Sequence, residues 1–286
     1  MTAGPLVEAQ ALTVAVPGQS RGFGRRIPRD IVRGVDLAVP RGGAVGLVGE
    51  SGSGKTTLGR ALVGLAPAAA GRVLFDGADL AAAKGPALRA LRARMQMIFQ
   101  DPQSALNPRL TIGTTLVRPL EAFGRLEGRR ARRARAAELL DLVGLPGDAL
   151  DRYPHELSGG QRQRIGIARA VALEPDFIVA DEIVSGLDVS TQAQILLLLE
   201  DLRRRLGLTL VFISHDLSVV RVLCDEVVVL LRGEVVEAGP CAAVFDAPRH
   251  AYTAALLQAV PLPEIDPAWL DRPALAAHIP PLAASG

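Results

Sequence analysis

The sequence predicts an α/β protein built on a mostly parallel β-sheet, and three observations point to this fold class. Short apolar segments of strand length alternate with longer segments of helical character, which is the pattern of a parallel sheet covered by helices on both faces. A glycine-rich loop joins one apolar segment to a predicted helix. Between about residues 101 and 170 the sequence becomes helical and basic, which indicates an inserted helical subdomain.

The predicted elements divide the chain into one large domain and a short tail. Residues 1–260 are expected to form the domain, and the Pro- and Ala-rich residues 261–286 a loosely attached tail. A helix is expected from Lys55 to Val63. The predicted strands, in chain order, cover 6–16, 31–39, 44–48, 96–99, 177–180, 208–213 and 226–231.

Composition favours a protein that stays in the cytoplasm. The chain has 286 residues, of which 49% are hydrophobic, and its net charge is +2. Its mean hydropathy is positive, at +0.26, but no apolar run approaches the roughly 20 residues that a spanning helix needs. The first ten residues lack the basic and apolar regions of a secretory signal.

The two cysteines and two arginine clusters say little about metal sites or binding partners. Cys224 and Cys241 cannot supply a disulfide framework or four thiolate ligands for a metal, and we expect two reduced, buried thiols. The arginine clusters could contact anionic lipid headgroups or an acidic loop of a partner, although such runs are more often solvated faces. The clusters are Arg21, Arg25, Arg26 and Arg29, and Arg129, Arg130, Arg132, Arg133 and Arg135.

Residues 49–56 fit the phosphate-loop pattern G-x-x-x-x-G-K-[ST]. Glycines let successive backbone N–H groups point at phosphate oxygens, and the following helix adds its positive N-terminal end. Lys55 would reach the β- and γ-phosphates, and the Thr56 hydroxyl would ligate Mg²⁺. The loop therefore predicts a bound nucleotide phosphate and Mg²⁺. The predicted nucleotide-binding residues are Gly49, Glu50, Ser51, Gly52, Ser53, Gly54, Lys55, Thr56 and Thr57.

Two adjacent acidic residues directly follow the predicted strand at 177–180. Asp181 would hold Mg²⁺, and Glu182 would polarise the attacking water. Adjacent acids after a strand are a weak signal alone, but they gain weight beside a phosphate loop.

A second anion site is predicted in the helical region. Ser158, Gly159 and Gly160 offer a hydroxyl and bare N–H groups where a helix should begin, followed by Gln161. The segment Leu157-Ser158-Gly159-Gly160-Gln161 matches the signature pentapeptide of ABC ATPases, so the chain resembles that family from about Leu6 to Pro263.

The resemblance implies further parts of an ABC nucleotide-binding domain, whose fold adds an antiparallel β subdomain and a helical subdomain to the core sheet. Gln100 is similar to the Q-loop glutamine that senses the metal and couples to the permease, and His215 to the switch histidine that contacts the γ-phosphate. Residues 185–188, ending in Asp188, resemble the D-loop that crosses a head-to-tail dimer. The family also stacks an aromatic residue on adenine. The matching position falls near Val16, with Phe23 the nearest aromatic.

Three segments narrow the resemblance to the ATPases of the oligopeptide, dipeptide and nickel uptake group. Residues 100–109 and 249–257 are similar to segments of that group, although Ala251 replaces a proline. The run 107–109, and Ile183-Val184 after Glu182, look like the second of its two paired ATPases. The resemblance implies two membrane-spanning permease subunits, a second and non-identical ATPase, an extracytoplasmic solute-binding protein, and a place on the cytoplasmic face of the cell membrane.

Other functions remain as alternatives. The solute could be a peptide, nickel or another small molecule, because this subunit does not contact it. A nucleic-acid ABC ATPase would show a long coiled coil or cysteine pairs between the motifs, and a translation-type one would carry two such domains. The sequence shows none of these, so no nucleic-acid partner is expected. A non-hydrolysing regulator is disfavoured by Glu182, His215 and the complete signature.

Overall fold

A computed structural model describes residues 4–17, 28–101 and 105–259. The predicted tail, Phe23, and the arginines at 21, 25 and 26 lie outside the described residues.

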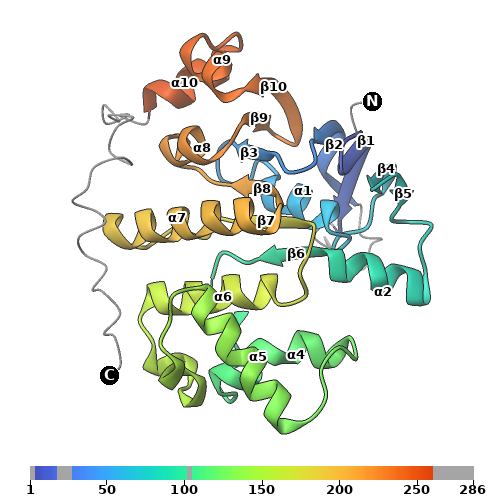
Figure 1. The fold of residues 1–286 in the computed structure, drawn as a ribbon. Coiled ribbons are helices and arrows are strands. Elements are labelled where there is room, and N and C mark those ends of the chain that lie inside the picture. Colours follow the sequence, from blue (N-terminus) through green and yellow to red (C-terminus); the bar gives the residue numbers. More distant parts are fainter. Residues whose placement is uncertain (1–3, 18–27, 102–104, 260–286) are drawn as a thin grey trace, which may run out of the picture.

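The core sheet has the strand order β10-β9-β3-β8-β7-β6 (Figure 1). Five strands are parallel, and β10 pairs antiparallel with β9 at one edge. The strands are β3 (Ala44–Val48), β6 (Met95–Ile98), β7 (Phe177–Asp181), β8 (Thr209–Ile213), β9 (Glu226–Leu231) and β10 (Glu234–Pro240). The residues of β3, β7 and β8 are all buried, because helices or a second sheet cover both faces.

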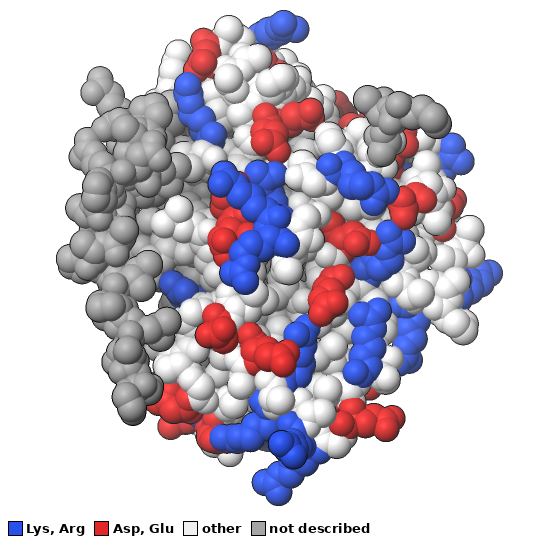
Figure 2. All heavy atoms as spheres, viewed as in Figure 1, with Lys and Arg blue, Asp and Glu red and all other residues white. Residues whose placement is uncertain are grey.

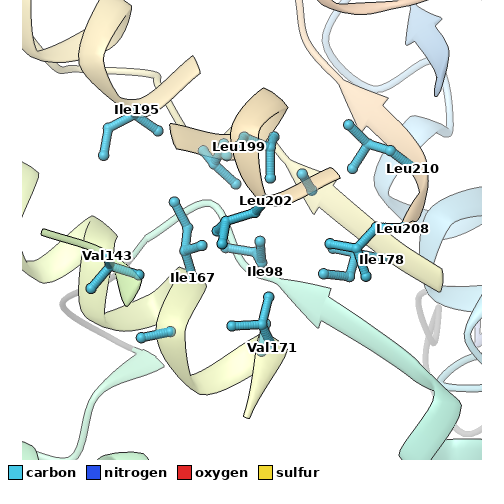
Figure 3. Packing of buried hydrophobic residues seen from close by; sticks show 14 of the residues in the cluster. Ile98, Val143, Ile167, Val171, Ile178, Ile195, Leu199, Leu202, Leu208 and Leu210 are labelled. Atoms are coloured by element: carbon cyan, nitrogen blue, oxygen red, sulfur yellow. The ribbon is translucent and has the colours of Figure 1, made fainter. Parts of the chain in front are cut away.

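One face of the core sheet packs against α6 (Gly159–Val171) and α7 (Val189–Leu206). Figure 3 shows strand residues such as Ile178 and Ile98 meeting Ile167 of α6 and Leu202 of α7. The other face packs against α1 (Lys55–Leu62), whose Leu58 and Leu62 belong to a separate core cluster. Helices α1 and α6 therefore cover opposite faces of the sheet.

The second sheet is antiparallel and confirms the predicted β subdomain. Its strand order is β2-β1-β4-β5, and it contributes to the same core cluster as α1. The strands are β1 (Val7–Val16), β2 (Arg29–Val39), β4 (Ala70–Phe75) and β5 (Ala78–Asp79). The segments predicted at 6–16 and 31–39 are thus its longest strands.

The helical elements between β6 and β7 form the lower part of the molecule in Figure 1. They are α4 (Ile112–Ala122), α5 (Arg129–Leu142), the short 3₁₀ segments at 147–151 and 154–156, and α6. Elsewhere the helices are α2 (Gly85–Arg94), α8 (Leu217–Leu223), α9 (Cys241–Asp246) and α10 (Ala251–Ala259). In the described part of the chain, no helix is long and apolar enough to cross a membrane.

The arginines of α5 are largely matched by acids. Arg132 pairs with Glu121, and Arg133 with Asp151. Arg135 pairs with Glu138 and with Glu174. Figure 2 shows the same interleaving of basic and acidic side chains over one face of the molecule. These pairs support the interpretation of this cluster as a solvated face.

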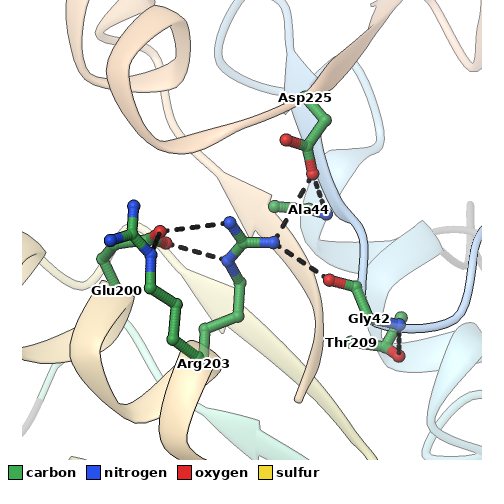
Figure 4. Close-up of polar contacts among 7 residues, drawn as sticks. Gly42, Ala44, Glu200, Arg203, Thr209 and Asp225 are labelled. Atoms are coloured by element: carbon green, nitrogen blue, oxygen red, sulfur yellow. Dashed lines mark hydrogen bonds and ion pairs between the residues drawn. The ribbon is translucent and has the colours of Figure 1, made fainter. Parts of the chain in front are cut away.

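A polar network around Arg203 fixes the amino ends of the central strands (Figure 4). Arg203 pairs with Glu200 at 2.8 Å and donates to the Gly42 carbonyl at 2.9 Å. It also lies 3.5 Å from Asp225, whose carboxylate accepts the Ala44 N–H at 2.8 Å. Arg203 therefore ties α7 to the segments that lead into β3 and β9.

Replacing Arg203 by alanine should destabilise the protein by about 1–3 kcal/mol, because the Gly42 carbonyl and Glu200 lose a half-buried partner. Arg204 is the matched control: it pairs only with Glu200 among its described contacts, and its side chain is 76% exposed against 17% for Arg203. Arg204→Ala should cost below about 0.5 kcal/mol. Urea unfolding of both variants tests this, and equal losses would contradict it.

Candidate nucleotide-binding and hydrolysis site

The phosphate loop runs from the carboxyl end of β3 to the first turn of α1, as predicted. Gly49 and Gly54 have φ angles of 144° and 107°. A Cβ on Gly49 would lie 2.2 Å from the Leu230 carbonyl oxygen, and one on Gly54 would lie 2.9 Å from the Ile31 carbonyl oxygen. Only glycine fits both the backbone conformation and this close approach.

The interior of the loop suits an anion. The Lys55 ammonium donates to the carbonyl oxygens of Gly49 at 2.7 Å and Glu50 at 2.8 Å. Burial lowers the pKa of Lys55 below its ordinary value, and the charges of Glu182 and Asp181 oppose this shift. The Ser53 hydroxyl is buried and has no hydrogen-bond partner among the described residues. A bound phosphate would supply acceptors for both side chains, so these residues fit a nucleotide phosphate.

Thr56 and Asp181 form the predicted metal-binding pair. The Thr56 hydroxyl donates to the Asp181 carboxylate at 3.0 Å, and Asp181 is only 2% exposed. Burial raises the pKa of Asp181, an effect that the Thr56 hydrogen bond opposes. A hydroxyl and a buried carboxylate side by side are hard oxygen ligands of the kind Mg²⁺ prefers. Together with Gln100 and Arg60 they line one pocket.

Glu182 lies at the centre of the predicted catalytic residues. Its carboxylate accepts a hydrogen bond from the Gln100 amide at 2.7 Å and lies 3.7 Å from His215 Nδ1. The backbone at Glu182 has a φ of 47°, and its N–H donates to the Ile213 carbonyl at 2.9 Å. This left-handed conformation is uncommon for a glutamate, and such strain often accompanies functional sites.

The parallel sheet explains why these distant residues meet. Gln100 and His215 follow β6 and β8, Asp181 is the last residue of β7, and the phosphate loop follows β3. The carboxyl ends of these neighbouring parallel strands lie at one edge of the sheet, which is where open α/β sheets bind ligands. The structure therefore brings together the predicted phosphate, metal and hydrolysis residues.

Alanine at Gly49 should abolish tight ATP binding, raising the Kd more than about tenfold, because the new Cβ collides with a backbone carbonyl and φ is unfavourable. Gly64 is the matched control. It also has a positive φ, of 68°, but its nearest neighbour is 3.8 Å away, and it lies outside the loop. Gly64→Ala should keep ATP affinity within about twofold, because its Cβ meets no backbone atom. ATP titration of both variants, with circular dichroism to confirm folding, decides this; equal affinities would contradict it.

The signature segment forms an ordered helix start. The Ser158 hydroxyl accepts the Gln161 N–H at 3.3 Å, and the Gln161 side chain accepts the Ser158 N–H at 2.9 Å. This reciprocal pair is a capping box. A Cβ on Gly160 would lie 2.5 Å from Thr191 Cγ2 of α7, so a larger residue there would require the Thr191 side chain to shift. The signature begins α6, on the sheet face opposite to α1, so the two predicted phosphate sites belong to different elements of the chain.

Asp188 ends the D-loop by capping α7. Its carboxylate accepts hydrogen bonds from the Ser190 hydroxyl at 2.5 Å and from the Thr191 hydroxyl and N–H at 2.7 and 2.9 Å. These bonds lower the pKa of Asp188 well below its ordinary value. The described contacts of Asp188 thus lie within its own helix, and its predicted role toward nucleotide stays a prediction.

One contact at the site was not predicted. The hydroxyl of Tyr252, on α10, accepts the Glu50 N–H of the phosphate loop at 2.8 Å. Residues 249–257 carried only a subgroup resemblance, and nothing local in the sequence links positions 202 residues apart.

The position that stacks on adenine also remains a prediction. Val16 is 38% exposed, and Phe23 lies outside the described residues.

Family models match both parts of the chain. The ABC transporter model matches residues 32–185. The model of the oligopeptide/dipeptide transporter C-terminal region matches residues 236–285.

Individual relatives agree with the family models. A protein of Brucella ovis, predicted to be a peptide import ATP-binding protein, is 52% identical over 250 residues, which cover 87% of this chain and 78% of the relative. A Brucella abortus protein with the same description is 52% identical over 242 residues, or 84% of this chain and 72% of the relative.

Solved structures show the same fold. The dimeric ATP-binding cassette MJ0796, in a post-hydrolysis state with ADP and Pi, has a TM-score of 0.71 and 30% identity, covering 82% of this chain and 98% of that chain. The cbiO1 protein of Clostridium perfringens, part of the ABC transporter complex cbiONQ, has a TM-score of 0.70 and 26% identity, covering 85% and 92%. The chain therefore belongs to the ABC transporter family, as an ATP-binding protein of the oligopeptide/dipeptide transporter type.

Proposed function

We propose that this chain hydrolyses MgATP on the cytoplasmic face of a membrane and thereby drives peptide import through separate permease subunits. The observation that carries the proposal is the meeting of Gln100, Glu182 and His215 beside the phosphate loop. The match of residues 236–285 to the oligopeptide/dipeptide C-terminal model supports peptides as the solute.

The site residues divide the work of hydrolysis. Lys55 and the loop N–H groups would hold the phosphates, and Thr56, Asp181 and Gln100 would hold Mg²⁺, which neutralises phosphate charge when bound. Glu182 would accept a proton from the attacking water and orient it. His215 would contact the γ-phosphate from the end of β8.

The working unit is a head-to-tail pair of ATPases. Dimeric cassettes among the solved structures support the pairing, and so does the presence in this chain of both a phosphate loop before α1 and a signature at the start of α6. Each ATP would lie between the loop of one chain and the signature of the other, among them Ser158, Gly159, Gly160 and Gln161. The segment at 107–109 favours a non-identical partner, with two permease subunits and an extracytoplasmic binding protein completing the transporter.

The alternative solute is nickel or another non-peptide molecule. ATPase assays of the reconstituted transporter separate the two, with the binding protein loaded with peptide, loaded with Ni²⁺ or empty. We expect stimulation by the peptide-loaded form alone. Stimulation only by the Ni²⁺-loaded binding protein would show that the solute is Ni²⁺ and not a peptide. The absence of ATPase activity under every condition would refute the proposed function.

A further inference from the structure

We propose that Tyr252 is a positioning residue for nucleotide binding, whose hydroxyl oxygen holds the first turn of the phosphate loop by accepting the Glu50 N–H at 2.8 Å. This inference rests on the proposed function. It assigns the C-terminal helix α10 a direct part in the ATP site.

The Glu50 peptide is held from two sides. Its carbonyl accepts Lys55 Nζ at 2.8 Å and the Ser53 N–H at 3.2 Å, while its N–H bonds to Tyr252. Lys55 Nζ has three N–H donors, and those that turn to a phosphate would no longer be available to the loop carbonyls. The hydrogen bond from the Glu50 N–H to the Tyr252 hydroxyl uses no atom of Lys55. It can therefore remain when Lys55 donates to a phosphate. Tyr252 would therefore hold the start of the loop even where Lys55 donates to a phosphate instead of to Glu50.

The hydroxyl is itself held in position by a rigid attachment of α10. Glu237 of β10 accepts the N–H groups of Arg249 at 2.8 Å and His250 at 3.1 Å. His250 Nδ1 then accepts the Tyr252 N–H at 3.1 Å. The Tyr252 ring packs against the core cluster that contains Val244 and Phe245. Because the side chain is already ordered, its hydrogen bond carries little further entropic cost.

The strand β9 confines the same turn from a second direction. A Cβ on Gly49 would meet the Leu230 carbonyl, and β9 leads directly into β10 and its Glu237. The C-terminal segment thus borders the loop at Gly49 through β9 and at Glu50 through Tyr252. A change in the docking of α10 would therefore move this hydroxyl and alter the phosphate loop that binds the nucleotide.

The test measures ATP binding by the full-length chain and KM and kcat of the assembled transporter. Tyr252→Phe keeps the packed ring and removes the acceptor. We expect its Kd and KM for ATP to rise about three- to tenfold, the effect of one net hydrogen bond, with kcat changed less than about twofold because the groups around Glu182 are untouched. Tyr153→Phe changes the other tyrosine of the chain and should leave Kd unchanged. Amide exchange at Glu50 should accelerate in Tyr252→Phe alone.

Three results would overturn the inference while leaving the proposed function intact. The first is a Tyr252→Phe Kd equal to that of wild type. The second is unchanged exchange at Glu50. The third is a loss of ATP affinity in Tyr153→Phe as large as that in Tyr252→Phe, because the effect would then not depend on the bond to Glu50. Failure of the wild-type chain to bind ATP would instead refute the proposed function.

Discussion

ATP hydrolysis by the assembled transporter is expected to fall about 10²–10⁴-fold when Glu182 is replaced by glutamine, the range for loss of a general base. Glutamine preserves the size of the side chain and can still hydrogen-bond Gln100, but it cannot accept a proton from water. ATP binding should remain within a few-fold of wild type, because Lys55 and the loop amides are unchanged. Steady-state hydrolysis and ATP titration on the same preparation measure both effects.

Glu174→Gln provides a matched control. Glu174 also has a left-handed backbone, with a φ of 56° against 47° at Glu182. Its side chain is 73% exposed and pairs with Arg135. None of its described contacts is with Gln100, Glu182 or His215. We expect this variant to hydrolyse ATP at the wild-type rate. If Glu182→Gln retains hydrolysis within a few-fold of wild type, Glu182 is not the base.

Disabling the two halves of this chain separately should empty two different ATP sites. Lys55→Ala removes the buried cation that would bind the phosphates, while a Ser158→Ala, Gly159→Ala double change alters the start of α6. In the proposed head-to-tail pair the phosphate loop and the signature of this chain serve different ATP sites. Each change should therefore leave about one trapped ATP per complex in the Glu182→Gln background, because only interactions at its own site are lost.

Crosslinking of a photoreactive ATP then identifies which phosphate loop keeps the nucleotide. Lys84→Ala is the control, because Lys84 is the other lysine of the chain and precedes α2. Loss of the same site in both variants would contradict the head-to-tail arrangement. A fully active transporter with two copies of this chain would contradict the non-identical partner.

Much of the candidate catalytic site could be predicted from the sequence because its residues lie at the ends of strands. The apolar segments at 44–48 and 226–231 coincide with β3 and β9, and 177–180 falls one residue short of β7. Parallel pairing then brings the residues after these strands together, and this geometry does not depend on their separation along the chain.

The rest could not be predicted because its signals are weak or distant. Strand β10 is an edge strand without a fully buried residue, and β5 has two residues, so neither shows an apolar run. In α2 only Ala93 is buried, which leaves little helical periodicity. The contact between Tyr252 and Glu50 depends on how β10 and α10 return to the loop, which no local pattern specifies.

Uptake of a labelled peptide into proteoliposomes tests the central claim most directly. The vesicles would contain the permease, both ATPases and the peptide-loaded binding protein, with ATP on the side of this chain. Wild type should accumulate peptide with ATP and not with a non-hydrolysable analogue, and the Glu182→Gln complex should not accumulate it. Equal peptide accumulation by the wild-type and Glu182→Gln complexes would contradict the account.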